Sequence, residues 1–243
     1  MTLALDVQSV SIRRGGLQIL DSLDLEVEKG SVTGVIGPNG AGKTTLFNVV
    51  SGFMRPDAGV VLVEGEPITG LLPEKICARG LARTFQKVRG FPTLSVRENV
   101  LVGALHRNSV HSAAELVDQL LSGLGLDPYA DVPAEVLPVG LRKRLEVARV
   151  LATEPNVVLL DEVMGGLVPT EVKEMMTFIR ALPEQGVTVV FIEHHMEAVM
   201  TISDKVVVID RGKNLAVGTP REVAANSAVV AAYLGEDYNS AQA

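Results

Sequence analysis

One nine-residue stretch, GPNGAGKTT at residues 37–45, restricts the fold more than any other feature of the sequence. It matches the pattern G-x-x-x-x-G-K-[ST], between a strand-like run, SVTGVI, and a helix-like run, TTLFNVVSG. In that context the backbone N–H groups of the loop face phosphate oxygens, and the start of the following helix adds partial positive charge. The pattern therefore predicts a nucleotide site, with Lys43 near the β- and γ-phosphates and Thr44 as a Mg²⁺ ligand.

A second candidate site lies in NVVLLDE, residues 156–162, where an apolar run ends in two carboxylates. A buried strand that ends there places Asp161 at the carboxyl edge of a sheet, where ligands bind in α/β folds. Asp161 suits Mg²⁺, and Glu162 suits polarisation of an attacking water molecule. Gln86 in RTFQ and His194 in VVFIEHHM also follow strand-like runs, but neither residue alone indicates a function.

The order of apolar runs predicts an α/β fold. Strand-like runs come early, a helical middle covers about residues 96–152, and further apolar strands then alternate with helical stretches. Continuous apolar strands that alternate with helices imply a mainly parallel sheet covered on both faces. We therefore expect one domain over residues 1–243, with a core formed by residues 1–95 and 153–243 and a helical subdomain between them.

Composition and charge exclude several classes of protein. The chain has 243 residues, which fits one large domain, and its net charge of −7 argues against a general nucleic-acid binder. It contains no apolar run long enough to span a bilayer, and the charges of its N-terminus are in the wrong order for a signal peptide. The single cysteine, Cys77, cannot form an internal disulfide and fits a reducing compartment. We therefore expect a globular cytoplasmic protein.

Taken in order, the motifs resemble those of the ATP-binding subunit of an ABC transporter, over nearly the whole chain. GPNGAGKTT resembles the Walker A motif, Gln86 the Q-loop glutamine, VVLLDE the Walker B motif and His194 the switch histidine. VLPVGLRKRLEVAR, residues 136–149, stands where the signature motif, usually LSGGQ, is found. The resemblance implies an ABC-type P-loop NTPase with a mainly parallel core sheet, an N-terminal antiparallel β region and a helical subdomain that carries the signature helix.

The resemblance also implies ATP and Mg²⁺ as cofactors and a set of residues for each role. The catalytic residues would be Lys43, Gln86, Glu162 and His194. The Mg²⁺ ligands would be Thr44, Gln86 and Asp161. The ATP-binding residues would be Arg14, Gly37, Pro38, Asn39, Gly40, Ala41, Gly42, Lys43, Thr44 and Thr45. The residues that contact ATP bound to a partner subunit would be Pro138, Val139, Gly140, Leu141 and Val168.

Arg14 stands just before Gly15 and Gly16, where the family normally has an aromatic residue that stacks on adenine. A guanidinium plane can also stack on a base. The alternative is a solvated Arg14, with adenine held by other contacts.

Several segments resemble, more narrowly, the ATPases of branched-chain amino-acid importers. These segments are ARTFQKVRGFPTLSVRENVLVG, LATEP and the ending GTPREVAANSAVVAAYLGED. The resemblance implies ATP hydrolysis that powers import of branched-chain amino acids or related small polar solutes, at the cytoplasmic face of the cell membrane. It also implies integral-membrane permease subunits and a solute-binding protein, which choose the solute, so that amino acids, amides and urea-like solutes stay open.

A groove beside the Q-loop receives a short permease helix in this family. Phe91, Leu94 and Val96 would supply its apolar floor, or would instead be ordinary core of the helical subdomain.

The signature motif departs from the family pattern. In the family, two ATPase subunits sandwich ATP head to tail, and one of them supplies the signature. Aligned on LSGGQ, Pro138, Val139 and Leu141 replace Ser, Gly and Gln, while Gly140 is kept. Loss of the Ser hydroxyl removes a charge-assisted hydrogen bond worth roughly 1.5–3 kcal/mol. A Pro at the first helical position still leaves the N–H groups that follow it able to face an anion, so we expect weakened binding of the partner's ATP.

Val168 is a second departure, because the D-loop usually has Asp or Asn there. Both departures lie on the surface offered to the partner's ATP, whereas the chain's own hydrolytic residues are intact. We therefore expect a heterodimer with a second ABC ATPase subunit, although a homodimer stays open.

Three other functions are alternatives to an importer ATPase. One is a regulatory subunit that hydrolyses ATP weakly, which the altered signature favours and the intact Glu162 and His194 oppose. Another is a soluble non-transport ABC ATPase, but such proteins usually carry tandem cassettes or a long coiled-coil insertion. A small-molecule kinase would not explain Gln86, LPVGLRKR and His194 in series.

Overall fold

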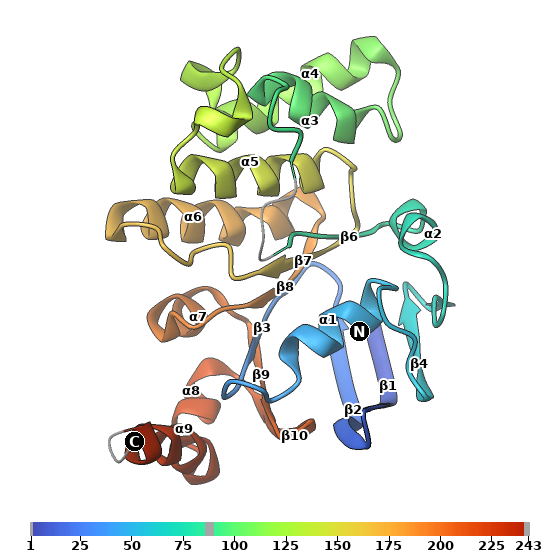
Figure 1. Cartoon of the computed structure of the whole chain (residues 1–243), viewed down its shortest axis with the longest axis vertical. Helices are drawn as coiled ribbons and strands as arrows, with labels where there is room; N and C mark the ends of the chain where they lie inside the picture. The colour runs from blue at the N-terminus through green and yellow to red at the C-terminus, as the bar shows by residue number, and fades with distance from the viewer. Residues whose placement is uncertain (1, 86–89, 241–243) are drawn as a thin grey trace.

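The computed structural model describes residues 2–85 and 90–240, with side chains in the last helix described through Tyr233. The described residues form two β-sheets, which lie in the middle and lower part of the view in Figure 1. The first is an antiparallel sheet with strand order β2-β1-β4-β5, and its strands begin near the N-terminus. Its strands are β1 (Leu3–Arg14), β2 (Leu17–Glu28), β4 (Ala58–Val63) and β5 (Glu66–Pro67).

The second sheet has strand order β10-β9-β3-β8-β7-β6, and every neighbouring pair is parallel except β10 with β9. Its strands are β3 (Val32–Ile36), β6 (Leu81–Arg83), β7 (Val157–Asp161), β8 (Thr188–Ile192), β9 (Lys205–Asp210) and β10 (Lys213–Gly218). The prediction of a mainly parallel core sheet with an N-terminal antiparallel β region is therefore confirmed.

The central strands of the parallel sheet are mostly apolar, because both faces of the sheet are covered. In β7, Val158 and Leu160 belong to a cluster with the helices, whereas Val157 and Leu159 belong to a cluster on the opposite face. Side chains of a strand alternate between the two faces, so a doubly covered strand reads as a continuous apolar run. The run in NVVLLDE thus follows from burial on both faces.

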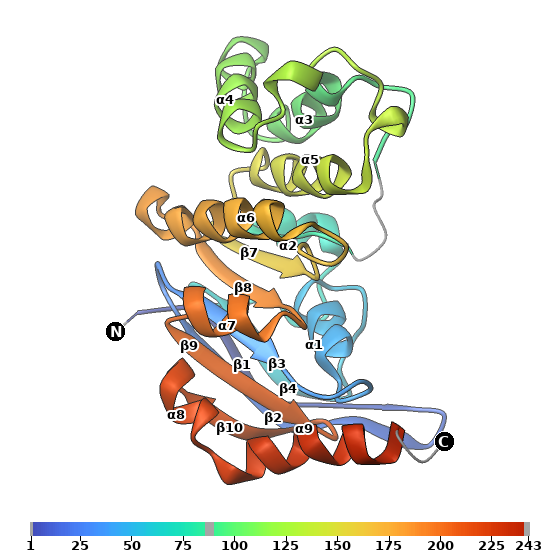
Figure 2. The ribbon, with the colours of Figure 1, turned by 90° about the vertical axis from the view of Figure 1, so that its left-hand side faces the viewer.

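Nine α-helices occur in the described part of the chain, and α5 and α6 lie side by side between α3, α4 and the sheet (Figures 1 and 2). The helices are α1 (Lys43–Val50), α2 (Pro73–Ala78), α3 (Val96–Ala104), α4 (Val110–Gly123), α5 (Val139–Leu151), α6 (Pro169–Ala181), α7 (Met196–Ile202), α8 (Pro220–Ala224) and α9 (Ser227–Ser240). Three of them, α3 to α5, fall within residues 96–152. Whether this region behaves as a separate subdomain stays a prediction.

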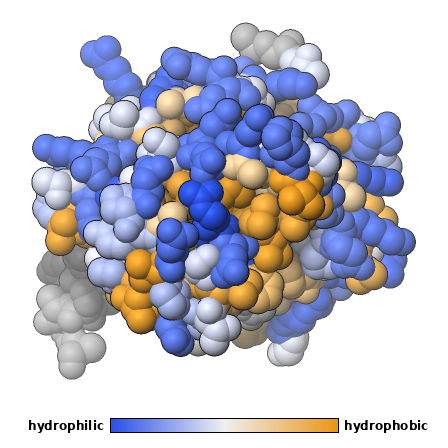
Figure 3. Space-filling model, turned by 90° about the horizontal axis from the view of Figure 1, so that it is seen from above, coloured by the Kyte–Doolittle hydropathy of each residue, from blue (hydrophilic) through white to orange (hydrophobic). Residues whose placement is uncertain are grey.

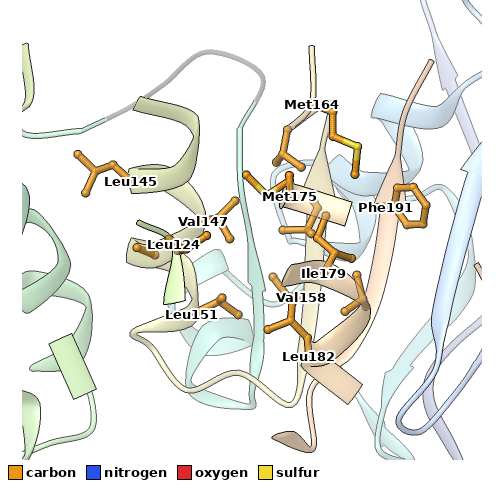
Figure 4. Packing of buried hydrophobic residues seen from close by; sticks show 14 of the residues in the cluster. Leu124, Leu145, Val147, Leu151, Val158, Met164, Met175, Ile179, Leu182 and Phe191 are labelled. Carbon is orange, nitrogen blue, oxygen red and sulfur yellow. The ribbon is translucent and has the colours of Figure 1, made fainter. Parts of the chain in front are cut away.

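One apolar cluster joins α5 and α6 to the sheet (Figure 4). Val147 and Leu151 of α5 and Ile179 of α6 share this cluster with Val158 of β7 and Phe191 of β8. Burying a side chain of this size contributes roughly 1.5–3 kcal/mol. The second half of α5, the helix that begins with the altered signature, is therefore anchored on the sheet.

None of the described helices is long and apolar enough to cross a membrane. Figure 3 views the molecule from the end formed by α3 and α4, where apolar side chains gather between hydrophilic ones. Val102, Leu105 and Val110 are exposed on these helices or next to them. Val102 also lines the groove described below.

Candidate nucleotide site

The functional residues predicted from different motifs converge because their strands run parallel. The carboxyl ends of β3, β8, β7 and β6 lie in that order along one edge of the sheet. The loop of residues 37–42 follows β3, His194 follows β8, and Glu162 follows β7. This edge is the place where ligands bind in open α/β sheets.

The turn between β3 and α1 requires glycine. Gly42 has a φ of 109°, and a Cβ atom there would lie 2.7 Å from Cδ2 of Leu20. A Cβ on Gly37 would collide with the carbonyl oxygen of Ile209. The glycines therefore let the loop curl tightly against the neighbouring strands, as a phosphate-binding loop must.

Lys43 and the start of α1 form the phosphate-binding part of the site. The Nζ atom of Lys43 donates to the carbonyl oxygens of Gly37, at 2.5 Å, and Pro38, at 2.9 Å. The first amide groups of a helix have no partner within the helix, so those of α1 are suited to phosphate oxygens. Thr44 is exposed and Thr45 half-buried in the same turn. The loop thus fits the phosphates of a nucleotide.

Asp161 ends β7, and its side chain is only 2% exposed. Its Oδ2 atom accepts a hydrogen bond of 2.8 Å from Nη2 of Arg83, and its amide donates to Oγ1 of Thr84 at 2.8 Å. Mg²⁺ in nucleotide sites uses one or two carboxylates together with phosphate oxygens. The Asp161 carboxylate and the Thr44 hydroxyl are oxygen donors of this kind, so the residues present fit the ion.

Glu162 and His194 are brought together by the pairing of β7 with β8. Nε2 of His194 lies 3.0 Å from Oε1 of Glu162. The His194 side chain is 51% exposed and the Glu162 side chain is 24% exposed, so both can reach a bound ligand. Glu162 has a φ of 51°, which non-glycine residues seldom adopt and which is common at functional sites. A carboxylate placed in this way can orient a water molecule.

Two residues that the sequence analysis missed hold the backbone around Glu162. Nζ of Lys143, from α5, donates a hydrogen bond to the carbonyl oxygen of Glu162. Oε1 of Glu193 accepts a hydrogen bond of 2.7 Å from the amide of Met164, two residues after Glu162. Only the position of Glu193 at the end of an apolar strand could have indicated it.

Glu193 is 2% exposed, and this burial raises the pKa of its carboxyl group. The amide of Met164 and the neighbouring charges of His195 and Lys143 oppose the effect in part.

Glu146 of α5 is a second buried carboxyl group at the site. Burial raises its pKa, while its Oε1 accepts a 2.8 Å hydrogen bond from the Phe85 amide. The next residue, Gln86, lies outside the described residues, so its predicted role stays untested.

The start of α5 differs from the expectation in one respect. Pro138 does not occupy the first helical position; it is the N-cap residue, with φ −56° and ψ 159°, and Val139 begins the helix. The extended ψ is the conformation that a capping residue adopts, and proline supplies no side chain that could cap the helix. Leu141 packs in part against the apolar core.

Gly140 is buried beside a carboxylate that the sequence analysis did not anticipate. A Cβ atom on Gly140 would lie 2.6 Å from Oε1 of Glu171, the third residue of α6. The two valines that replace family residues on this surface are open to solvent, with Val139 52% and Val168 56% exposed. The surface that was expected to meet the partner's ATP therefore presents valine side chains.

Arg14 lies at the end of β1, and its guanidinium donates to the carbonyl oxygens of Arg13, at 2.7 Å, and Arg55, at 3.3 Å. It also lies 3.8 Å from a carboxylate oxygen of Asp57 and is half exposed. Stacking on adenine stays a prediction.

Comparison with known proteins gives consistent matches. The ABC transporter family model matches residues 20–165, and a model described as branched-chain amino acid ATP-binding cassette transporter matches residues 213–239. The chain is 41% identical over 250 residues to the high-affinity branched-chain amino acid transport ATP-binding protein BraF of Pseudomonas aeruginosa, covering 96% of this chain and 98% of BraF. It is 39% identical over 249 residues to the corresponding protein LivG of Escherichia coli, with the same coverage.

Solved structures of similar proteins agree with these matches. A nucleotide-free ATP-binding cassette from an ABC transporter has a TM-score of 0.87 and 29% identity, covering 96% of this chain and 99% of its own. An ATP-binding cassette in its ADP conformation has a TM-score of 0.86 and 30% identity, covering 97% of this chain and 99% of its own.

Proposed function

Because the chain belongs to the ABC transporter family of ATP-binding subunits, we propose that it hydrolyses Mg²⁺-ATP to power an importer of branched-chain amino acids or related small polar solutes. ATP hydrolysis is supported by the Glu162–His194 pair, whose Oε1 and Nε2 atoms lie 3.0 Å apart at the same sheet edge as the phosphate-binding loop. The solute class is supported by the names of the relatives, BraF and LivG.

The residues divide the work of hydrolysis between them. Glu162 orients the attacking water, and His194 holds Glu162 and contacts the terminal phosphate. Lys43 and the start of α1 stabilise the charge that develops on the phosphoryl group. Thr44 and Asp161 would hold Mg²⁺, which would neutralise negative charge on the phosphate oxygens. The hydrogen bonds from Lys43 to the carbonyl oxygens of Gly37 and Pro38 hold its ammonium group beside the loop.

The permease is proposed to bind in a groove of about 400 Å³ between α2, α3 and α5. Phe53, Phe85, Phe91 and Val102 give it apolar walls, and it also contains charged residues. Of the three residues expected at its floor, Phe91 lines the groove. Leu94 is half-buried and is not among the lining residues, and Val96 is fully buried in the core. Such an apolar groove with a polar rim suits a short amphipathic helix. The chain would then act as a peripheral subunit at the cytoplasmic face of the membrane.

The second ATPase subunit is proposed to be a different chain. In a homodimer, Val139 and Val168 would face the phosphates at both sites, and neither side chain can form a hydrogen bond with them. A partner with a polar signature would complete the site formed by Lys43 and Glu162. The exposed valines also favour a second candidate function, a regulatory subunit with slow turnover. Turnover would be slow at both sites if the partner's signature were altered in the same way.

Stimulation of hydrolysis tests the proposal. The chain is purified with its second ATPase subunit and the permease subunits in lipid nanodiscs, and hydrolysis is measured with the solute-binding protein, with and without leucine. We expect leucine-loaded binding protein to raise the rate and the Glu162→Gln variant to lose most of it. Equal rates with and without the permease subunits would refute a role in import.

A further inference from the structure

Arg83 is a buried arginine that belongs to neither the phosphate-binding loop nor the Glu162–His194 pair. It is the last residue of the edge strand β6 and pairs in register with Leu159 of β7. Its side chain is 4% exposed, and Nη2 lies 2.8 Å from Oδ2 of Asp161. The carboxylate assigned to Mg²⁺ is therefore already paired with a protein cation.

The rest of the guanidinium is held by α1, the helix that begins with Lys43. Nη1 donates to Oδ1 of Asn48 at 2.7 Å and to Oγ of Ser51 at 3.1 Å. The guanidinium carbon also lies 5.4 Å from the centre of the Phe47 ring. A planar guanidinium with these contacts has a fixed direction, and so does the carboxylate that it binds.

Stability alone does not account for this arrangement. Replacing a buried ion pair by apolar residues of similar volume is often neutral or stabilising, because the pair loses its hydration when it is buried. In addition, Nε of Arg83 is buried and has no hydrogen-bond partner among the described residues. An unpaired buried donor costs roughly 1–3 kcal/mol, so the arrangement points to a function.

Arg83 is also part of the wall of the groove. The same groove is lined by Phe85 and Phe53, whose rings pack edge to face with centres 5.2 Å apart. The Arg83 guanidinium carbon lies 5.3 Å from the centre of the Phe85 ring. One side chain thus touches the groove on one side and the Mg²⁺ carboxylate on the other.

We propose that Arg83 is a positioning residue, which orients Asp161 for Mg²⁺ and connects that carboxylate to the groove. Among the described residues, Oδ2 is the carboxylate oxygen of Asp161 that receives a hydrogen bond, so Oδ1 is left for the metal or a water molecule bound to it. A segment seated in the groove would act on the metal site by displacing Phe85 and, with it, the guanidinium. The connection to the groove rests on the proposed function, whereas the orientation of Asp161 does not.

The effect of Mg²⁺ on ATP affinity tests the orientation of Asp161. In the Glu162→Gln background, which prevents turnover, equilibrium dialysis measures ATP affinity with Mg²⁺ and with EDTA. We expect Arg83→Met to keep the affinity measured in EDTA and to reduce the gain from Mg²⁺ by about 10- to 100-fold, as for other partners of metal ligands. Arg83→Lys, which keeps the charge but not the fork, should fall between this variant and the unmutated chain.

Arg149→Met is the matched control. Arg149 lines the same groove and its guanidinium lies over the Phe91 ring, 5.4 Å from the ring centre, so this variant also removes a groove arginine. Its gain from Mg²⁺ should equal that of the unmutated chain. If Arg83→Met fails to fold, Arg83→Lys decides the question. An unchanged or larger gain from Mg²⁺ in the folded Arg83 variants would overturn the proposal.

The connection to the groove is tested in the assembled complex. Arg83→Lys should still co-purify with the permease subunits but lose most of the stimulation of hydrolysis by them. Full stimulation of this variant would overturn the connection. Absence of stimulation in the unmutated complex would instead refute the proposed function, while the dialysis measurement would still decide on Asp161.

Discussion

Replacement of Glu193 gives a prediction that the structure makes quantitative. This carboxyl group is 2% exposed, and its Oε1 accepts a 2.7 Å hydrogen bond from the amide of Met164. Glu193→Leu leaves that amide buried without an acceptor, which costs roughly 1–3 kcal/mol. For a chain of this size, each kcal/mol lowers Tm by roughly 2–4 °C. We therefore expect a fall of a few degrees in thermal unfolding.

The matched variant Glu193→Gln keeps an oxygen acceptor and removes the charge. Burial raises the pKa of Glu193 above its ordinary value of 4.5, so the folded chain holds a proton that the unfolded chain has already released. The stability of the unmutated chain therefore falls as pH rises from that value to the raised pKa. Glu193→Gln has no such loss of stability. At pH 7 its unfolding temperature should therefore equal or exceed that of the unmutated chain, and this difference in temperature should shrink near pH 4.

Thermal unfolding of the three chains between pH 4 and pH 8, together with their ATP hydrolysis, checks both statements. Because Met164 follows Glu162 by two residues, Glu193→Leu should also lower hydrolysis more than Glu193→Gln. Unfolding of Glu193→Leu at the same temperature as the unmutated chain, or a lower stability of Glu193→Gln than of Glu193→Leu at pH 7, would contradict this role of Glu193.

Three further predictions concern the nucleotide site and its partner surface. Gly42→Ala should abolish ATP binding, since its Cβ would lie 2.7 Å from Leu20 at a φ of 109°; ATP retention on equilibrium dialysis would contradict this. Glu162→Gln should lower the rate of hydrolysis by about 10²- to 10⁴-fold while ATP binding persists, as measured by phosphate release and dialysis. Val168→Asp should raise turnover at the partner's site, measured in a complex whose other site carries Glu162→Gln, and an unchanged rate would remove Val168 as the cause of slow turnover.

The sequence predicted the nucleotide loop and the sheet well because both depend on local patterns. Glycine, lysine and threonine at fixed spacing identified the turn after β3, and continuous apolar runs identified strands buried on both faces. Both Glu162 and His194 follow predicted strands. Since parallel strands end at the same edge of a sheet, their proximity could be predicted in outline.

The sequence did not reveal the residues that hold these groups from elsewhere in the fold. Arg83, Lys143 and Glu193 act through contacts between segments far apart in sequence. No local pattern marks Arg83 or Lys143, and only its place at the end of an apolar strand marks Glu193. The start of α5 was misjudged by one residue for a similar reason. Pro138 fits either the cap or the first turn by its type alone, and its extended ψ of 159° in the structure makes it the cap.

Uptake of labelled leucine into proteoliposomes measures whether ATP hydrolysis by this chain drives import. The liposomes contain the permease subunits with both ATPase subunits, ATP inside and the solute-binding protein outside. We expect uptake that requires ATP and that Glu162→Gln in this chain largely removes. Uptake that continues at the full rate with Glu162→Gln, or without this chain, would contradict it.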